Sequence, residues 1–543
     1  MIRITELKLP LDHAEAALPE LIAHTLGIAA SDLRAHTTYK RSYDARMKKL
    51  LLVYICDVQV APGLEEKLLK QFEAHPHIRP TPDQTYYPVV QLNAAPSIRP
   101  VVVGFGPCGI FAALLLAQMG FKPIVLERGK KVRERTKDTW DLWRKNTLHP
   151  ESNVQFGEGG AGTFSDGKLW SQIKDPRHLG RKVMQEFVKA GAPEEILLVS
   201  KPHIGTFKLV KVVEHMREQI IALGGEVRFE QRLNDVLIEH GHLRGLTVQN
   251  LNDSTSYELR ADHVVLALGH SSRDTVAMLH ERGVYMEAKP FSIGFRIEHP
   301  QGLIDRARLG QHAGHPLLGA ADYKLVHHAM NGEGKGRSVY SFCMCPGGTV
   351  VAATSEVGRV VTNGMSQYSR NERNANAGIV VGITPADYPG GPLAGIEFQR
   401  QLESHAYVLG GSNYAAPGQL VGDFLSGRPS AALGSVEPSY KPGVLLGDLA
   451  SALPGYAIAA MREAIPVFGK KIRGFDMHDA VLTGVETRTS SPVKITRGDD
   501  FQSLNVKGLY PAGEGASYAG GILSAGVDGI EVAEAVARSL VKP

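Results

Sequence analysis

Cysteine is scarce in this sequence: its 543 residues include only Cys56, Cys108, Cys343 and Cys345. They are too few and too irregularly spaced for a disulfide framework, which small secreted folds use to compensate for a small core. A disulfide-stapled fold is therefore excluded, and a reducing compartment, the cytoplasm, is the expected location.

Long apolar runs are missing as well. A membrane-spanning helix needs roughly 18 consecutive apolar residues, and the run at residues 110–119 is far shorter. The opening stretch MIRITELKLPLDHAE lacks the basic and then apolar pattern of a secretory signal. We therefore expect no membrane partner.

Neither charge sign dominates. Lys and Arg number 60, Asp and Glu 56, and the net charge is +4, which by itself predicts no polyanionic partner. The densest basic stretch is KRSYDARMKK at residues 40–49. It raises the hypothesis that the N-terminal region binds RNA or a protein. A solvated hairpin is the alternative, because no aromatic pattern for base stacking accompanies the charge.

The N-terminal residues form a predicted α+β module. We expect a strand at residues 2–9, a helix from an N-cap at Asp12 through His24, and a strand at residues 33–39. The apolar stretch LLLVYICDVQV adds a further strand. This mixture of a helix and paired strands indicates a compact, ferredoxin-like unit.

Six prolines at residues 75–100 indicate an extended linker and a domain boundary. After it, strand and helix patterns alternate, a mixed segment rich in Gly and Pro turns follows, and the last residues return to strand, glycine turn and helix. Residues 224–239 read as a strand pair. The predicted domains are an N-terminal module, a dinucleotide-binding domain in two parts, and an inserted domain between those parts: residues 1–95, 96–289 with 481–543, and 290–480.

The clearest motif is GFGPCG at residues 104–109, between the apolar strand VVV and an apolar helix. Gly104 permits the tight turn, Gly106 lets the backbone approach a pyrophosphate, and Gly109 lets the helix pack on its strand. The start of the helix at Pro107 offers free N–H groups and a partial positive charge to phosphates. This motif predicts a bound dinucleotide.

An acid stands at the expected place after this motif. Glu127 ends the next apolar strand, close to the spacing of about 20 residues at which an acid accepts hydrogen bonds from a ribose. FAD and NAD share this fold and this first loop, so the fingerprint alone does not separate them.

Three later segments resemble the glutathione-reductase-like FAD superfamily. LYPAGEGASYAGGILSAG at residues 509–526 is similar to the strand, acid and helix that approach the flavin. VVLALGH, which contains Gly269, is similar to an internal strand of that superfamily. ESNVQFGEGGAGTFSDGKLW at residues 151–170 is similar to a segment that wraps the cofactor. The resemblance implies FAD. It also implies cofactor contacts at Gly104, Gly106, Pro107, Cys108, Gly109, Glu127, Arg128, Gly159, Gly160, Ala161, Gly162, Thr163, Leu233, Gly269, Gly513, Glu514, Gly521 and Ile522.

From about residue 100 onward the chain resembles more narrowly a bacterial family of FAD-dependent dehydrogenases whose substrate is not established. The motifs that carry this resemblance are PHIGT, GHSSRDT, KPFSIGFRIEHPQ, YSFCMCPGG and GVETRTSSP. An added small N-terminal domain also fits that family. Ser517 departs from it, because glycine is expected there, and a serine that faced the flavin would narrow the approach to the ring.

Two features of the superfamily's disulfide reductases are missing. The sequence has no second glycine fingerprint for NAD(P)H and no Cys-x-x-x-x-Cys after the first helix. Cys108 lies inside the phosphate loop and is expected to be a small packed residue. NAD(P)H, where it serves as reductant, is therefore expected to dock transiently.

Cys343 and Cys345 are one residue apart. In an extended strand they would share a face with Cα atoms about 6.6 Å apart, at the upper limit for a disulfide of about 6.8 Å. Packed thiols, a redox or nucleophilic pair, and a metal site remain open, with packed thiols favoured. No second cysteine pair supports a metal, and none is predicted, although His327 and His328 could complete such a site.

Two further motifs combine acids and arginines. In FRIEH, a strand would place Arg296 and Glu298 on one face, where they could bind a carboxylate and move a proton. In ETRTSSP, Glu486 and Arg488 would share a face, and Arg488 is the residue expected near the reactive edge of the flavin. Internal ion pairs are the alternative for both motifs. His270, which follows a buried strand, is expected to be a polar cap rather than a base.

The sequence thus predicts an α/β protein: a Rossmann-type FAD-binding domain, an inserted α+β substrate or cap domain, and the N-terminal module. The predicted function is an FAD-dependent oxidoreductase that transfers a hydride between a small-molecule substrate and FAD. A flavoprotein that acts on RNA or protein through its N-terminal module, and a flavin sensor without turnover, are the alternatives. Nothing in the sequence predicts an oligomeric state.

Overall fold

The computed structural model describes residues 1–44, 49–94 and 96–541. By their internal contacts these residues form two compact units. The first comprises residues 1–87 and 168–203, and the second residues 88–167 and 204–543. The first unit thus includes a segment, residues 168–203, that the sequence pattern assigned to the dinucleotide-binding domain. The tip of the predicted basic hairpin, residues 45–48, lies outside the described residues.

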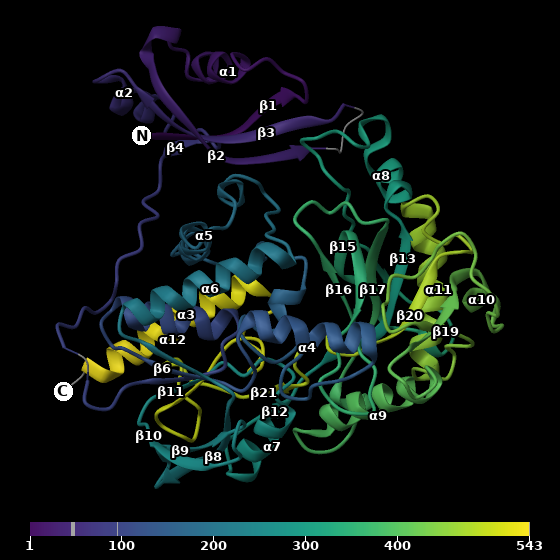
Figure 1. Cartoon of the computed structure of the whole chain (residues 1–543). Helices are drawn as coiled ribbons and strands as arrows, with labels where there is room; N and C mark the ends of the chain where they lie inside the picture. The colour runs from purple at the N-terminus through teal and green to yellow at the C-terminus, as the bar shows by residue number, and fades with distance from the viewer. Residues whose placement is uncertain (45–48, 95, 542–543) are drawn as a thin grey trace. The chain divides into compact units, whose positions relative to one another are not determined.

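The N-terminal module has the predicted ferredoxin-like arrangement, with two helices and a four-stranded antiparallel sheet in the order β2-β3-β1-β4 (Figure 1). Its elements, in chain order, are β1 Ile2–Pro10, α1 Ala17–Leu26, β2 Leu33–Asp44, β3 Leu51–Val60, α2 Leu64–Gln71 and β4 Ile78–Pro80. Side chains alternate between buried and half-buried along β3, because successive residues of a strand face opposite sides of the sheet.

The predicted start of the first helix is wrong. Asp12 is not its N-cap, because residues 10–13 form a turn in which the N–H of His13 donates to the carbonyl of Pro10. The helix begins at Ala17, after Ala16. Residues 168–203, the second segment of the first unit, contain α5 (Leu179–Lys189). They are bound to β2 at Arg41, whose N–H donates to the carbonyl of Leu198 at 2.6 Å.

A five-stranded parallel sheet forms the centre of the dinucleotide-binding part, in the order β22-β11-β5-β6-β7. Its strands are β5 Val101–Val103, β6 Ile124–Glu127, β7 Glu226–Phe229, β11 Val264–Leu266 and β22 Leu509–Pro511. Numbered along the chain, this is the order 5-4-1-2-3 of a Rossmann-type sheet. The strand order reverses at β5: β6 and β7 lie on one side of β5, and β11 and β22 lie on its other side. In such sheets ligands bind at the carboxyl ends of the strands, next to this point of reversal.

Three helices lie side by side against this sheet: α3 (Pro107–Gln118), α6 (Thr206–Ala222) and α12 (Ile522–Val541) (Figure 1). The contact between α3 and α12 is close, since a Cβ on Gly529 would lie 2.4 Å from the carbonyl oxygen of Cys108. α4 (Val132–Lys145) and α7 (Arg273–Glu281) complete this part.

The strand pair predicted at residues 224–239 is wrong, because its two strands belong to different sheets. β7 joins the parallel sheet, whereas β8 (Gln231–Glu239) pairs with β9 (His242–Asn250), which pairs in turn with β10 (Ser256–Arg260). Glu230 separates β7 and β8 with a φ of 57°, a left-handed conformation that redirects the chain. The apolar pattern does not reveal this turn.

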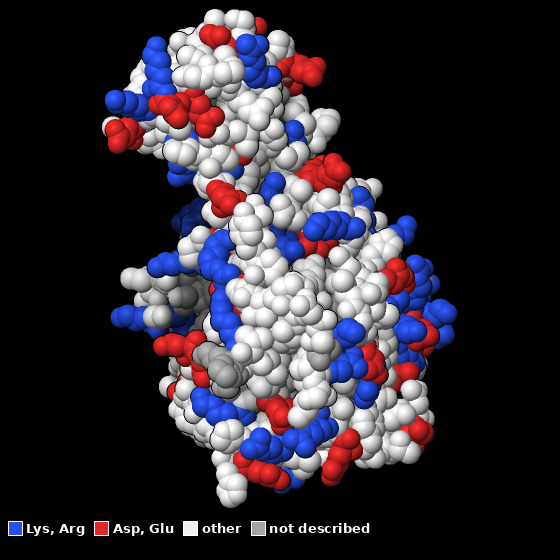
Figure 2. Space-filling model, turned by 90° about the vertical axis from the view of Figure 1, so that its left-hand side faces the viewer, with Lys and Arg blue, Asp and Glu red and all other residues white. Residues whose placement is uncertain are grey.

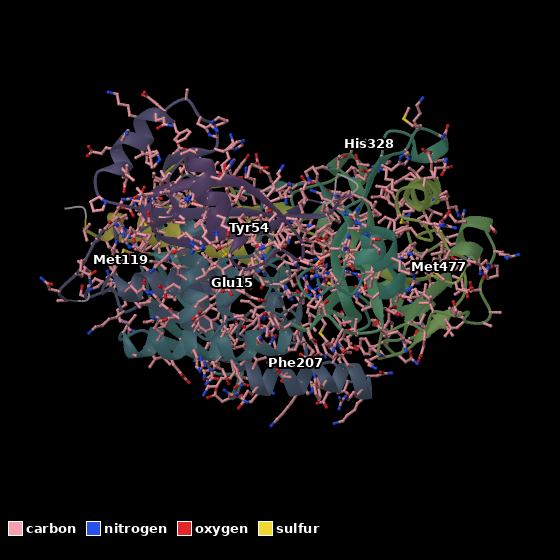
Figure 3. All side chains as sticks on the ribbon, turned by 90° about the horizontal axis from the view of Figure 1, so that it is seen from above. Glu15, Tyr54, Met119, Phe207, His328 and Met477 are labelled. Carbon is pink, nitrogen blue, oxygen red and sulfur yellow. The ribbon has the colours of Figure 1, made fainter. Side chains whose placement is uncertain are left out.

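The inserted domain is built on an eight-stranded sheet in the order β14-β15-β17-β13-β20-β18-β19, with β16 paired to β15. Its strands are β13 Phe291–Pro300, β14 Val326–His328, β15 Ser338–Ala352, β16 Thr362–Ser366, β17 Asn374–Ile383, β18 Ala416–Leu420, β19 Val444–Leu446 and β20 Val481–Glu486. Its helices are α8 Gln301–Leu309, α9 Ala394–Leu409, α10 Val421–Ser426 and α11 Gly455–Lys471. In Figure 3, Met119 after α3 and Met477 after α11 mark opposite sides of the second unit.

The predicted boundary at residue 480 needs one correction. β20 was assigned to the C-terminal part of the dinucleotide-binding domain, but it pairs with β13 and β18 in the sheet of the inserted domain. An apolar strand pattern does not reveal which sheet a strand joins. The chain crosses between the two parts through the short pair β12 (Glu287–Ala288) and β21 (Val493–Lys494).

On the face drawn in Figure 2, basic and acidic side chains are mixed, as expected from the small net charge of +4. Among the described residues, no helix is both long and apolar enough to cross a membrane.

Candidate functional site

The three glycines of the phosphate loop have different surroundings. A Cβ on Gly104, whose φ is 99°, would lie 2.1 Å from the carbonyl oxygen of Ala267, and a Cβ on Gly109 would lie 2.0 Å from that of Gly104. A Cβ on Gly106 would make only an ordinary contact, 3.5 Å from the Cα of Gly160. The fold itself therefore requires Gly104 and Gly109, and Gly106 is the position where a ligand rather than the protein would need the space.

Two helix N-termini meet beside this loop. In α3 the first bonded amide is that of Ile110, and in α12 that of Ala525. Among the described residues, the earlier amides of both helices have no acceptor: Cys108, Gly109, Ile522, Leu523 and Ser524. Unpaired N–H groups and the helix dipoles attract an anion.

Gly162 lies where these two helices begin. A Cβ there would lie 3.0 Å from Cγ1 of Ile522 and 3.5 Å from Cγ of Pro107. The segment before it crosses the phosphate loop, since a Cβ on Gly160 would lie 2.7 Å from the Cα of Gly106. Ala161 and Thr163 belong to the same turn. Gly159 packs closely against it, since a Cβ placed on Gly159 would lie 2.1 Å from Oγ1 of Thr163. The structure thus brings three predicted segments together.

Glu127 is buried, and its carboxylate binds backbone. It accepts from the N–H groups of Phe105 at 2.9 Å, Gly129 at 2.8 Å and Gly157 at 2.9 Å. A carboxylate offers about four acceptor positions, so one is left for a ribose hydroxyl. Glu127 therefore ties the phosphate loop to the segment at residues 157–163, and its contact with a ribose stays a prediction.

Arg135 of α4 is a buried residue that the sequence pattern does not predict. Its side chain is 0% exposed and donates to the carbonyls of Asn153, Val154, Gly157 and Glu158. Burial lowers its pKa to about 10. In sequence it is one of several charged residues of an amphipathic helix, and nothing distinguishes it from its exposed neighbours. Arg135 holds the loop that carries the predicted cofactor glycines.

The loop after β22 is fixed by an acid on α12. The N–H of Gly513 donates to Oδ2 of Asp528 at 2.6 Å, and Arg497 pairs with Oδ1 of Asp528 at 2.5 Å. Below Gly513 lies Cys108, whose Cβ is 2.9 Å from the position of a Cβ on Gly513. Cys108 is buried, and burial raises the pKa of its thiol well above the usual range. The expectation of a packed residue agrees with this position.

Glu514 lies in the same loop, half-buried, and burial raises its pKa to about 7. The ammonium group of Lys289 opposes this shift, and the thiol of Cys343 adds to it. Cys343 belongs to β15 of the inserted domain, and Lys289 follows β12 at the crossing between the two parts of the second unit. The two parts therefore approach each other here. Neither the glycine motif nor the spacing pointed to Lys289.

Open space borders this loop. Nothing lies within 4 Å of a Cβ on Gly269, Gly520 or Gly521, although the φ values of Gly269 and Gly521 are 68° and 133°. Gly515 reaches back to the end of β11, because a Cβ there would lie 2.4 Å from the carbonyl oxygen of Gly269. The ends of β11 and β22 therefore form one edge, as the point of reversal of the sheet requires.

Ser517 does not present a free hydroxyl. Its φ is 72°, in the region that favours glycine, and its Oγ donates to the carbonyl of Val493 at 2.8 Å. The serine thus adopts the conformation of the expected glycine and binds the strand β21.

Two predicted cofactor residues have other partners. Arg128 pairs with Glu151 and Asp274 at 2.8 Å each and lies over the ring of Phe156. Leu233 is buried in β8, in the core that β8 and β9 share with the five-stranded parallel sheet. Their contacts with a cofactor stay predictions.

Arg488 lies in a buried network rather than at a free edge. It donates to both oxygens of Glu403, at 3.2 and 3.1 Å, to Ser271 at 3.0 Å and to Ser355 at 2.7 Å. Arg273 bonds the same carboxylate at 2.9 and 2.7 Å. Burial tends to raise the pKa of Glu403, but the two arginines hold it well below its usual range.

Arg296 pairs with Glu486 across the neighbouring strands β13 and β20, at 2.8 and 3.1 Å. Its other donors reach the carbonyl of Cys343 and the side chains of Asn376 and Asn363. The arginine is fully buried, and Glu486 raises its pKa against the effect of burial. The internal ion pair considered from the sequence is present. Glu486 and Arg488 do not act together, because the strand ends at Glu486 and the two residues bind different partners.

Glu298 is also buried, and burial raises its pKa. It accepts from Ser439, with an Oγ to Oε1 distance of 2.5 Å, and from Asn374 at 3.0 Å. Arg296 and Glu298 therefore have separate partners, and Glu298 holds the loop that contains Ser439.

Cys343 and Cys345 are not disulfide-bonded. The register of β15 shifts between Phe342 and Cys345, and φ of Cys343 is 44°, so the face-sharing expected of a regular strand is wrong here. The thiol of Cys345 donates to the carbonyl of Cys343 at 3.4 Å, and that carbonyl also accepts from Arg296 at 2.8 Å. His327 pairs with Glu463 at 2.8 Å, and His328 contacts Ser338 at 3.0 Å; neither is bound to the cysteines.

Residues 290–489 match the family described as FAD-dependent protein, C-terminal domain-like. Residues 1–59 match a domain of unknown function. An uncharacterized protein of Clostridium beijerinckii is 47% identical over 549 residues, which cover 100% of this chain and 99% of that protein.

The chain also matches solved structures, at low sequence identity and low TM-score. The glycerol-3-phosphate dehydrogenase of Bacillus halodurans, complexed with FAD, is 10% identical with a TM-score of 0.36, over 82% of this chain and 66% of that one. The quinol fumarate reductase FrdA of E. coli is 12% identical with a TM-score of 0.36, over 83% and 72%. These low scores carry no information on substrate.

Proposed function

We propose that this chain is an FAD-dependent oxidoreductase. It belongs to one family with the Clostridium beijerinckii protein, and its residues 290–489 match the C-terminal domain of FAD-dependent proteins. The observation that carries the proposal is the edge of the parallel sheet where β5, β11 and β22 end. Three features meet there: the unpaired amides of α3 and α12, the free side of Gly106, and the open space at Gly269 and Gly521.

The residues present fit this cofactor. The amides of Cys108 and Gly109 would bind its pyrophosphate, since a helix N-terminus binds phosphate without further charge. Glu127 has one acceptor position left for a ribose hydroxyl. The amides at the start of α12 would face the end of the flavin. Bound FAD supplies the two-electron redox chemistry, and the protein binds, orients and tunes it.

The substrate would lie beside Glu514, where Cys343 of the inserted domain and Lys289, at the crossing after β12, act on its carboxyl group. With a pKa of about 7, Glu514 can hold or release a proton near neutral pH, which suits general acid and base work. Arg488, Arg296 and Glu298, engaged with other side chains, would position this region rather than touch the substrate. NAD(P)H would act as a transient reductant.

The purified protein tests this proposal. It is expected to carry a flavin that extraction identifies as FAD, and the flavin absorbance is expected to bleach under anaerobic conditions with NADH, NADPH or a member of a panel of amines, hydroxy acids and unsaturated acids. A chain without flavin would overturn the proposal. Bound flavin that none of these compounds reduces would support the sensor instead.

A further inference from the structure

His270 follows Gly269 at the end of β11, and the proposed function gives it no role. The glycine before it borders open space, since nothing lies within 4 Å of its Cβ position, and its carbonyl oxygen lies 2.4 Å from a Cβ placed on Gly515. His270 therefore stands at the edge where the dinucleotide is proposed to bind. Its Nδ1 lies 3.2 Å from Oγ of Ser271. The ring also bonds its own backbone, which only Nδ1 can reach. In the part of the chain that the structure describes, Nε2 therefore has no hydrogen-bond partner.

The hydrogen bonds around Ser271 determine which ring nitrogen carries the proton. The side-chain amide of Gln155 donates to the carbonyl of Ala353 at 2.9 Å, so its oxygen is the atom that faces Ser271. An amide oxygen only accepts. The hydroxyl of Ser271 therefore donates its single proton to Gln155, at 3.0 Å.

With that proton used, the oxygen of Ser271 acts as an acceptor toward its other neighbours. Arg488 donates to it at 3.0 Å. If Nδ1 of His270 were unprotonated, its lone pair would face a lone pair of the Ser271 oxygen, which is repulsive. Nδ1 therefore carries the hydrogen and donates it to Ser271. In a neutral ring the other nitrogen, Nε2, is then a hydrogen-bond acceptor.

The ring is neutral in the physiological range. Burial, and then the charges of Arg488 and Arg273, lower the pKa of His270 to about 3, against a smaller opposite effect of Glu403. A histidine held in this way is a poor base, and its Nε2 remains a hydrogen-bond acceptor near neutral pH.

We propose that Nε2 of His270 accepts a hydrogen bond from a hydroxyl of the bound dinucleotide. This inference rests on the proposed function. The hydroxyl belongs to the ribityl chain or to the adenosine ribose, and both present the same donor. Gln155, Ser271 and Arg488 act as positioning residues, because they fix the tautomer and leave Nε2 available.

Two variants separate the ring nitrogens. In His270→Asn the amide replaces Nδ1 and can still donate to Ser271, but no acceptor stands at the place of Nε2. In His270→Gln the longer side chain brings an amide oxygen toward that place. Titration of the apoprotein with FAD is expected to give about tenfold weaker binding for H270N, as for one lost hydrogen bond, and within about threefold of the wild type for H270Q. His280→Asn, an exposed position on α7, is the matched control and is expected to change nothing.

A parallel titration with ADP identifies the hydroxyl. Weaker FAD binding with unchanged ADP binding assigns the ribityl chain, and weaker binding of both assigns the adenosine ribose. Unchanged FAD binding by H270N, or equal loss in H270N and H270Q, overturns the inference. Wild-type apoprotein that binds ADP but not FAD overturns the proposed function and the inference with it. The difference between H270N and the wild type is expected to stay constant from about pH 5.5 to 8, because the ring does not titrate there.

Discussion

Individual buried polar residues fix the loops of this site. Arg135, Glu127 and Asp528 each bond backbone groups of a loop that carries predicted cofactor glycines. The glycine positions were predictable, because each has a known physical task in a phosphate loop. Arg135 and Asp528 were not, since their partners are backbone groups of distant segments and leave no mark in the local pattern.

Arg135→Met is expected to destabilise the protein by about 3 kcal/mol, because several buried carbonyls lose their donor at once. Urea denaturation of the apoprotein measures the change. Lys137→Met, at an exposed position of the same helix, is the control and is expected to stay within about 0.5 kcal/mol of the wild type. Equal stabilities of the two variants would contradict the role given to Arg135.

Glu514 gives a pH-dependent prediction. Its pKa in the folded protein is about 7, above the ordinary value of 4.5, so the folded state holds this proton more tightly than the unfolded state. The neutral carboxyl therefore contributes stability at low pH that is lost as pH rises through about 7. Relative to Glu514→Gln, the wild-type apoprotein is expected to lose stability between about pH 5 and pH 8. A difference that does not vary with pH would refute this assignment.

At the scale of elements, strands and helices were predictable and their partners were not. The short parallel strands and α3 follow directly from apolar runs bounded by glycine. Two strands joined unexpected sheets: β8 after the turn at Glu230, and β20 next to β13. In both cases the pairing is decided by tertiary packing, which the apolar pattern of a strand of six or nine residues does not encode.

Ser517 tests the loop between β22 and α12. Ser517→Gly removes a bond of about 1 kcal/mol and relieves a left-handed conformation of similar cost, so its stability is expected to match that of the wild type. Ser517→Ala removes the bond and keeps the conformation, and is expected to be about 1 kcal/mol less stable. Thermal unfolding of the two variants compares them directly. A glycine variant less stable than the alanine variant would contradict the observed backbone.

At the scale of the whole molecule, one buried network joins segments that are far apart in the sequence. Glu403 of α9 binds Arg273 at the start of α7 and Arg488 after β20. Arg488 was predictable from its motif but its acid was not, because folding alone brings the two residues together.

Glu403→Gln is expected to cost about 3 to 5 kcal/mol, since it leaves two buried arginines without their main counter-charge. Denaturant unfolding of the second unit measures this cost. Glu397→Gln, on the same helix with an exposed side chain, is expected to cost less than about 1 kcal/mol. A small effect at Glu403 would show that the network contributes little to the stability of this unit.

Gly106 lies at the edge formed by β5, β11 and β22, where FAD is proposed to bind, and its replacement by alanine examines that binding. Its φ is negative and a Cβ there meets only Gly160, at 3.5 Å, so Gly106→Ala is expected to fold with wild-type stability. The measurement is titration of the wild-type and G106A apoproteins with FAD. We expect one FAD per wild-type chain and binding at least about 100-fold weaker in G106A, because the methyl group occupies the space of the pyrophosphate. Equal affinities in two equally stable proteins would contradict it.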